Sequence, residues 1–513
     1  MKKQWRMIII SGAVLVALVA VWLIATLAGG GETVETTTTA TVEAVFASSA
    51  EDISRIDVSN DDGQYALLPQ QTTDDSGAAK IAWRVEGMDS LNFSADRLDE
   101  VGAAAVNLKA TKEIAANATD LVQFGLNEPP TKLVVTLKSG ARHVIKIGAE
   151  LPSGGGYYAM LDDSGRVCAI ASGDGESAAY SLLDLLDSTK VLGGIAAKDV
   201  TRLTFERASD QLKAVIDSIV TVSTDENGEE SISTEYKMVE PLQVTGNTYA
   251  MTTLFGDPLA VSASEFIEMD PQDLAKYGLD KPQYTYTYAA KQGTFSLKIG
   301  KQSDSDHYYA ISDAMPIIFT FPTELLTTND TKLISLVSRS FSAFSIFDTK
   351  QIDVDLFGTS FVTEISLDNG KNVFDDVTKL TLDGQDAKIV DQSGSSLYIS
   401  FFSKLTGVMA AGVDLEANPV NTHDGRLTFH IEEDTENNVP AFTKMIEFTP
   451  RDDYTYYVFI DGEYSGLYVD GKAAFTSEVK GSEGIIIAYR HMKYAIEHAV
   501  DGVFNTEEGY QLN

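Results

Sequence analysis

Asp52-Ile53-Ser54-Arg55-Ile56-Asp57-Val58 is a pattern that this chain repeats twice more. It returns as Asp199-Val200-Thr201-Arg202-Leu203-Thr204-Phe205 and, more loosely, as Asp348-Thr349-Lys350-Gln351-Ile352-Asp353-Val354. The copies begin at residues 52, 199 and 348, which are 147 and 149 positions apart. In each copy the fifth and seventh residues are apolar and the sixth is Asp or Thr, the period of two expected of a half-buried strand. We therefore predict that each copy opens one repeated domain.

Further blocks recur in the same order in the first two units. A turn ending in Phe124-Gly125-Leu126 matches one ending in Tyr277-Gly278-Leu279, and in both we expect glycine to adopt the left-handed conformation. The other matched pairs are Lys146-Ile147-Gly148 with Lys298-Ile299-Gly300, and Tyr157-Tyr158-Ala159 with Tyr308-Tyr309-Ala310. Agreement in order and residue type indicates duplication, and repeats of this length are tandem domains rather than solenoid units.

The third unit is degenerate. It keeps the opening strand, and Ile446-Glu447-Phe448 corresponds to the Lys-Ile-Gly strand, but the aromatic-Gly-Leu turn is absent. We expect residues 461–475 to be an insertion, a helix through Phe402, Leu405, Val408 and Val413, and a closing helix over residues 491–504. In the first unit we expect a helix from an N-cap at Ser94 to Leu108, and a closing helix through residues 180–186.

These patterns predict an α+β fold: an N-terminal transmembrane helix followed by tandem modules of antiparallel sheet with packed helices. The predicted organisation is a cytoplasmic tail (1–6), a transmembrane helix (7–28), a flexible tether (29–50), module 1 (51–197), module 2 (198–346) and a degenerate module 3 (347–513). Residues 7–28 carry no charge, and 22 helical residues span roughly 33 Å, enough for a bilayer core of about 30 Å. Lys2, Lys3 and Arg6 precede this segment and place the tail in the cytoplasm. The alternative, a cleaved signal peptide, has a shorter apolar region.

The charge balance excludes one class of partner. The formal net charge of −36 argues against nucleic-acid binding, which needs cations to displace counterions from phosphates. The single cysteine, Cys168, lies in an apolar run and is expected in the core. One cysteine cannot form an internal disulfide or a thiolate metal site.

At the level of families, the anchor, the opening strand, the Trp83 strand, the Phe124-Gly125-Leu126 turn and the paired tyrosines resemble a bacterial domain-of-unknown-function family of membrane-anchored envelope proteins. Members are usually encoded beside ABC-2-type permeases and the gliding-motility-associated auxiliary subunit. The resemblance implies an accessory role at a transporter or in envelope assembly, with these two proteins as partners. The family supplies no catalytic residues to carry over.

No motif in the sequence predicts a catalytic residue, a metal site or a cofactor. Phosphate-loop, Gly-x-Ser-x-Gly and His-Glu-x-x-His patterns are absent. His491 and His498 could share a helix face, but they lack a third metal ligand of clear spacing. The acidic run from Asp225 to Glu230 lacks the glycine that a calcium loop needs at its sixth position, so we expect a hairpin tip.

The paired tyrosines are the predicted partner-contact residues: Tyr157, Tyr158, Tyr308 and Tyr309. Neighbours in a strand point to opposite faces, so one tyrosine of each pair is expected in the core. The favoured function is a non-enzymatic, extracytoplasmic, single-pass membrane protein that acts by contact, through the bilayer at residues 7–28 and beside an ABC-2-type transporter. The alternatives are a binding module for cell-wall polymer or another ligand, and an unrecognised hydrolase.

Overall fold

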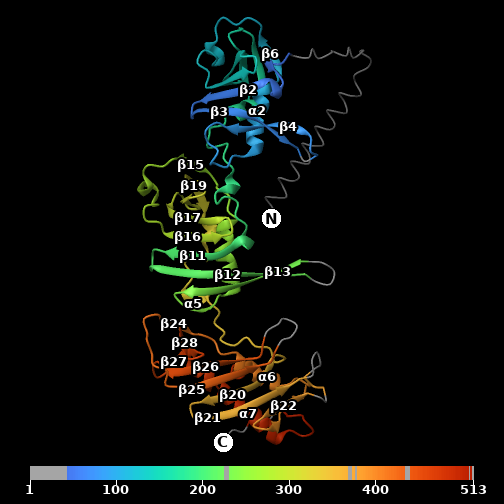
Figure 1. Cartoon of the computed structure of the whole chain (residues 1–513), viewed down its shortest axis with the longest axis vertical. Helices are drawn as coiled ribbons and strands as arrows, with labels where there is room; N and C mark the ends of the chain where they lie inside the picture. Colours follow the sequence, from blue (N-terminus) through green and yellow to red (C-terminus); the bar gives the residue numbers. More distant parts are fainter. Residues whose placement is uncertain are drawn as a thin grey trace, which may run out of the picture. The chain divides into compact units, whose positions relative to one another are not determined.

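A computed structural model describes residues 43–74, 76–224, 230–367, 373–375, 378–433, 440–507 and 509–510. Within them lie three large antiparallel sheets, of eight, nine and nine strands. Each repeat of the opening pattern forms a strand in the middle of one sheet: β2 (Ile53–Asn60), β11 (Val200–Arg207) and β20 (Thr349–Leu356). Figure 1 shows the three sheets in sequence colours. The predicted α+β class and the tandem antiparallel modules are confirmed.

The first sheet is built around β2, with the strand order β4-β3-β2-β7-β8-β9-β10-β6. Its other strands are β3 (Gly63–Thr73), β4 (Ala79–Val85), β6 (Lys112–Ala115), β7 (Thr131–Leu137), β8 (Arg142–Glu150), β9 (Gly156–Leu161) and β10 (Val167–Ala171). Two helices belong to it, α2 (Ala95–Val106) and α3 (Ser172–Ala178), and a small separate sheet pairs β1 (Phe46–Ala47) with β5 (Asn107–Leu108). Cys168 is buried in β10, as predicted.

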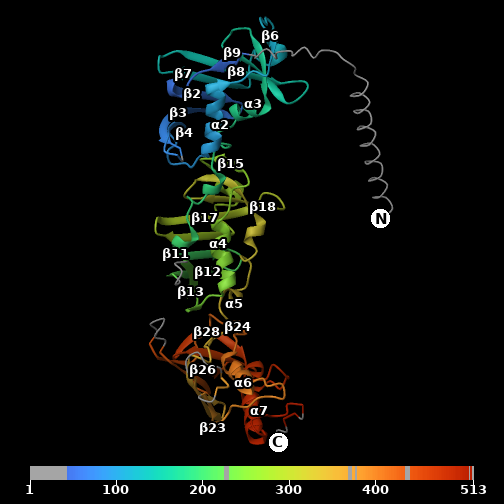
Figure 2. The same cartoon turned by 90° about the vertical axis from the view of Figure 1, so that its right-hand side faces the viewer.

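The second sheet repeats this order around β11 as β14-β13-β12-β11-β16-β17-β18-β19-β15. Its strands are β12 (Leu212–Thr224), β13 (Glu230–Glu240), β14 (Val244–Thr245), β15 (Phe266–Met269), β16 (Tyr284–Ala290), β17 (Gly293–Gln302), β18 (His307–Ser312) and β19 (Ile317–Pro322). Helix α4 (Thr248–Leu259) packs on it, with the Phe255 ring 4.9 Å from that of Tyr236, and a short helix α5 (Leu333–Leu336) follows. Figure 2 shows α4 along one face of this sheet.

The third sheet has the same order again, β23-β22-β21-β20-β25-β26-β27-β28-β24. Its strands are β21 (Thr359–Ser366), β22 (Lys379–Leu382), β23 (Gln385–Asp386), β24 (Gly412–Val413), β25 (Gly425–Ile431), β26 (Phe442–Pro450), β27 (Thr455–Ile460) and β28 (Glu463–Asp470). Helices α6 (Leu397–Thr406) and α7 (Ile485–His498) lie against it (Figure 2). The chain as a whole divides into two compact units, of which the second contains the second and third sheets.

A bulge recurs at the same place in all three opening strands. Pairing with the next central strand shifts register between Ile53 and Arg55, between Val200 and Arg202, and between Thr349 and Gln351. Beyond the bulge, the apolar fifth and seventh residues of each pattern are at most 3% exposed: Ile56, Val58, Leu203, Phe205, Ile352 and Val354. A bulge re-aims the residues that follow it, so its recurrence places each apolar pair on the core face.

The aromatic-Gly-Leu turn packs backbone against backbone. Gly125 and Gly278 have φ angles of +65° and +71°, the left-handed conformation predicted for them. A Cβ added at Gly148 would overlap the carbonyl oxygen of Phe124, and one at Gly300 would overlap that of Tyr277. Glycine is therefore required in the Lys-Ile-Gly strand by a close approach of two backbones, which explains why both motifs recur together.

Two predicted elements, an insertion and a helix, are wrong. The turn Asp461-Gly462 joins β27 to β28, so residues 461–475 are not an insertion; β28 is the strand equivalent to β10 and β19. Residues 180–186 contain no helix: residues 182–185 form turns and Leu186 forms an isolated bridge with Phe93, while the preceding helix α3 ends at Ala178. Apolar spacing alone did not distinguish a turn that buries leucines from a helix.

Helix ends also differ from the predictions, although the N-cap is correct. Ser94 Oγ accepts a hydrogen bond from Arg97 N at 3.4 Å, and α2 ends at Val106, so that Leu108 lies in β5. Helix α6 ends at Thr406, before Val408, while Val413 belongs to β24. Helix α7 begins and ends six residues earlier than predicted, at Ile485 and His498. Strand β5 follows α2 directly and pairs with β1, which ends that helix, whereas β24 begins only at Gly412.

Two predictions fall on residues outside the described ranges. The predicted tail, transmembrane helix and most of the tether lie within 1–42, and residues 225–229 of the acidic run from Asp225 to Glu230 are also outside the described ranges. Among the helices that the structure does describe, none is long and apolar enough to cross a bilayer.

Glycine-to-alanine variants test the backbone contact. We expect Gly148→Ala and Gly300→Ala each to lower the free energy of unfolding by about 1–3 kcal/mol, because the new Cβ must push a backbone carbonyl away. Denaturant unfolding followed by far-UV circular dichroism measures the change. The matched controls are Gly173→Ala in α3 and Gly256→Ala in α4, where nothing lies within 4 Å of the added Cβ. Equal free energies of unfolding for Gly148→Ala and Gly173→Ala would contradict a close backbone approach at Gly148.

Candidate functional site

The predicted contact tyrosines of the first module are both half-buried. Tyr157, in β9, lies over α3, where a Cβ at Gly175 would overlap its ring. Burial, with the carboxylates of Glu176 and Glu150, raises the pKa of Tyr157. Tyr158 points to the other face, and its ring meets that of Phe124 edge-on at 5.0 Å. Both side chains therefore have packing roles inside the module.

The second module repeats this arrangement. Tyr309 meets Tyr277 edge-on at 4.9 Å, and Tyr308 packs against the hydrophobic core. Tyr308 and Tyr309 are half-buried, so neither pair divides into one core tyrosine and one free tyrosine as the alternation of strand faces suggested. The second tyrosine of each pair packs on the aromatic residue of the aromatic-Gly-Leu turn. This contact explains why the paired tyrosines and the turn occur together in both modules. The exposed parts of these rings remain predicted contact points.

The third module places a buried carboxylate where the other two place lysine. Strand register aligns Glu447 of β26 with Lys146 of β8 and Lys298 of β17, since these residues face Arg426, Lys132 and Thr285 on the neighbouring strand. The Glu447 side chain is only 2% exposed. A buried charge needs partners, because desolvation disfavours the ionised form.

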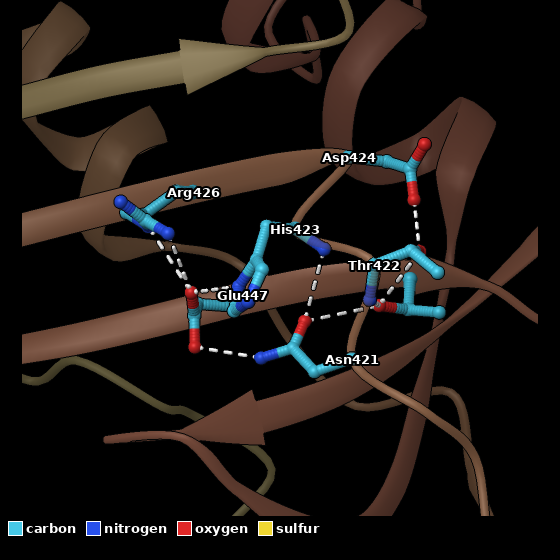
Figure 3. Close-up of polar contacts among 7 residues, drawn as sticks. Asn421, Thr422, His423, Asp424, Arg426 and Glu447 are labelled. Carbon is cyan, nitrogen blue, oxygen red and sulfur yellow. Dashed lines mark hydrogen bonds and ion pairs between the residues drawn. The ribbon is translucent and has the colours of Figure 1, made fainter.

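A polar loop, Asn421 to Asp424, supplies those partners (Figure 3). Nδ1 of His423 lies 2.6 Å from Glu447 Oε1, and the amide of Asn421 donates to Oε2 at 2.8 Å. From β25, Arg426 donates to Oε1 through Nε at 3.1 Å and pairs with it through a terminal nitrogen at 3.0 Å. Both carboxylate oxygens are thus engaged.

The loop is held in place by a second set of contacts. Thr422 N donates to Thr449 Oγ1 at 3.0 Å, and His423 N donates to Asn421 Oδ1 at 3.1 Å. His423 has a φ of +56°, which turns the chain so that its ring lies over Glu447. Thr449 occupies the position of Gly148 and Gly300. The polar loop therefore stands where the aromatic-Gly-Leu turn stands in the other modules.

The electrostatics of the site favour an ionised carboxylate. Burial by itself would raise the pKa of Glu447, but hydrogen bonds from His423, Asn421 and Arg426 outweigh it and hold this pKa below its ordinary value. An ionised carboxylate only accepts hydrogen bonds, so Nδ1 of His423 must carry a proton. Within the described residues Nε2 has no hydrogen-bond partner, and the His423 side chain is 53% exposed.

The chemistry of this arrangement rests on a buried carboxylate that orients an exposed imidazole. A carboxylate that orients an imidazole is one part of a catalytic triad, but no hydroxyl or thiol of the described chain is hydrogen-bonded to Nε2. No group of three or more His, Cys, Asp or Glu side chains in the described ranges could hold a metal ion. What the site presents outward is an imidazole and the Arg426 guanidinium, which is 41% exposed.

The two histidines considered from sequence do not meet. His491 stacks on Tyr510 with ring centroids 3.9 Å apart, beside a cavity of about 620 Å³ between α6 and α7, and burial lowers its pKa. His498 Nδ1 donates to the carbonyl of Tyr494 at 2.9 Å and stacks on that ring. The two side chains have separate environments and do not form a shared site.

Sequence reasoning missed the Glu447 site, although two signals were present. Ile446-Glu447-Phe448 was matched to the strands that contain Lys146 and Lys298, so a reversal of charge at an aligned position was visible. The missing aromatic-Gly-Leu turn was also visible. Together they indicate that another segment covers this face, but not that its residues are Asn421 to Asp424.

A comparison with protein families identifies the chain. Residues 83–261 and 237–389 each match the model described as "Domain of unknown function (DUF4340)", and together they span more than half of the chain. The chain belongs to the DUF4340 family. Both DUF4340 matches begin in equivalent strands, β4 and β13, and Glu447 lies beyond them. No curated protein and no solved structure matches the chain.

Neutralising Glu447 tests the role of this carboxylate. We expect Glu447→Gln to lower the free energy of unfolding at neutral pH by about 1–3 kcal/mol, because three donors lose a charged acceptor. Since the folded-state pKa lies below the unfolded value of about 4.3, the stabilisation is present above that pH and lost as pH falls through the folded pKa. The difference between wild type and variant should therefore shrink on acidification.

Urea unfolding at neutral pH and at acidic pH measures this effect. Glu463→Gln is the matched control, because Glu463 is an exposed glutamate on the nearby strand β28. A Glu447→Gln variant as stable as Glu463→Gln at neutral pH would mean that the network contributes nothing to stability.

Proposed function

We propose that this DUF4340 protein is a single-pass membrane-anchored, extracytoplasmic protein that is not an enzyme and acts by contact with other proteins. The charge-free segment 7–28, with basic residues before it, supports an anchor with the bulk of the chain outside the cytoplasm. The three modules share one topology, and their recurring motifs serve internal packing. A common framework of this kind suits a protein whose surfaces contact other proteins.

The loop from Asn421 to Asp424 is the observation that carries the proposal. In the third module this loop replaces an apolar turn and presents His423 and Arg426 to solvent above a buried carboxylate. The surrounding chain has a formal net charge of −36, so an exposed pair of cationic or hydrogen-bonding groups is a distinctive local feature. Such groups, fixed by a buried partner, suit recognition of a carboxylate or carbonyl on another protein.

The proposed setting is an ABC-2-type transporter or an envelope assembly, with this protein as an accessory or scaffold component. The permease and the gliding-motility-associated auxiliary subunit are the proposed partners, as the family resemblance of the anchor, strands and turn motifs implies. The lipid bilayer is the third partner, through residues 7–28. Nucleic acid is not expected, given the negative charge.

A binding module for cell-wall polymer is the second candidate. The cavity of about 620 Å³ between α6 and α7 favours it, since this volume falls in the range of ligand sites and the stacked pair His491 and Tyr510 offers ring surface. Aromatic rings pack well on the apolar faces of sugars. Saturation of this cavity by soluble wall fragments, measured by calorimetry, would favour this candidate.

Cysteine labelling tests the topology. Cys168 is the single cysteine and is buried, and burial raises the pKa of its thiol, so the native background should be low. We expect Lys138→Cys, on an exposed turn, to react with a membrane-impermeant maleimide in intact cells. Lys3→Cys should react only after permeabilisation. Labelling of both only after permeabilisation would contradict an extracytoplasmic location.

Site-specific photocrosslinking tests the contact role of the loop. A photoreactive residue in place of His423 should form an adduct with the permease or the auxiliary subunit in intact membranes, because this side chain is exposed beside Arg426. The same residue in place of Lys138, in the first module, is the matched control. Adducts from both positions, or from neither, would count against a specific contact at the third-module loop.

A further inference from the structure

The β12–β13 hairpin of the second module leaves one strand edge uncovered. Strand β13 pairs with β12 over most of its length, from Val215 with Glu240 to Thr224 with Glu230. On its other side β14 covers only Lys237 and Met238. Figure 1 shows the hairpin extending beyond the rest of its sheet. Residues 231–235 of β13 are therefore an edge without a neighbouring strand in the described chain.

The register determines which backbone groups point outward. Gly246 N donates to Tyr236 O at 2.8 Å, so Tyr236 directs its carbonyl away from β12. Hydrogen-bonding direction alternates along an antiparallel strand. Thr234 and Ile232 therefore direct their N–H and C=O groups outward as well, while Ser233 directs its own toward β12. Within the described residues no hydrogen bond outside the sheet ladders reaches the backbone of Thr234 or Ile232.

An apolar stripe follows the same part of the hairpin. On the core face, Ile216 and Met238 oppose each other and are completely buried. Farther along that face, Val222 and Ile232 oppose each other but are 54% and 56% exposed. Val220 lies on the same face between Ile216 and Val222 and is half-buried. The apolar face of the sheet thus continues beyond the core that covers it.

This edge lacks the usual protection against pairing. Natural edge strands carry proline, inward-pointing charge or lysine, or are covered by another segment. Residues 231–235 read Ser-Ile-Ser-Thr-Glu and contain neither proline nor lysine. An unpaired edge and an exposed apolar pair at the same place form a site suited to strand addition.

We propose that the outer edge of β13, at Ile232 and Thr234, takes up an extended strand from a partner protein in which apolar and basic residues alternate. The apolar side chains of that strand extend the Val222 and Ile232 pair, and its basic side chains lie on the opposite face, with exposed Glu235. A second copy of this chain is a poor occupant, because each copy has a formal net charge of −36. This surface is independent of the third-module loop.

Proline substitution tests the edge. Thr234→Pro removes an outward N–H without removing a bond to β12, whereas Thr234→Val keeps that N–H and serves as the matched control. The probe is a dye-labelled peptide of alternating valine and lysine, titrated with the full chain in detergent micelles and followed by fluorescence anisotropy. We expect binding by wild type and Thr234→Val, and about tenfold weaker binding by Thr234→Pro.

A second measurement needs no substitution. When the same peptide is added to wild type, amide hydrogen exchange should slow at Ile232 and Thr234 and stay unchanged at Ser233, which already bonds to β12. Equal peptide binding by Thr234→Pro and wild type, or unchanged exchange at Ile232 and Thr234, would overturn the proposal. So would equal binding of a peptide of alternating valine and glutamate, or a dimer of the chain that Thr234→Pro abolishes.

Discussion

Each sheet depends on a strand that comes first in its repeat and lies in the middle of the sheet. Strands β2, β11 and β20 pair on one side with the strand that follows directly and on the other with one that follows much later, β7, β16 or β25. Each central strand buries an apolar pair next to a bulge. This pairing sets the register of all later strands, because shifting it by one residue would turn every apolar side chain to the wrong face.

The same framework admits two different coverings on the face opposite the helices. In the first two modules an apolar turn approaches so closely that only glycine fits at residues 148 and 300. In the third module threonine stands at the equivalent position, and its hydroxyl accepts a hydrogen bond from Thr422 N. A polar covering then permits a buried glutamate, provided that His423, Asn421 and Arg426 engage its charge. The loop proposed for partner contact therefore belongs to the module that departs from the repeat.

The DUF4340 matches cover residues 83–389, so the family describes the shared packing of the first two modules better than the Glu447 network. The two surfaces proposed for contact lie on features that the modules do not share: the third-module loop and the long hairpin of β12 and β13. The shared motifs pack the interior of each module, whereas the features that differ between modules expose side chains or strand edges.

The sequence by itself determined the repeat, the opening strands, the N-cap at Ser94 and the class of fold, because these follow from local periodicity and from comparing the chain with itself. It also placed Gly125 and Gly278 in left-handed turns. Only the tertiary structure decided that Glu447 is buried, that Asn421 to Asp424 cover it, and that residues 461–475 contain a sheet strand. Those outcomes depend on contacts between segments far apart in the chain. Burial and hydrogen bonding between distant segments produce no periodic pattern in the sequence, so local sequence patterns cannot predict them.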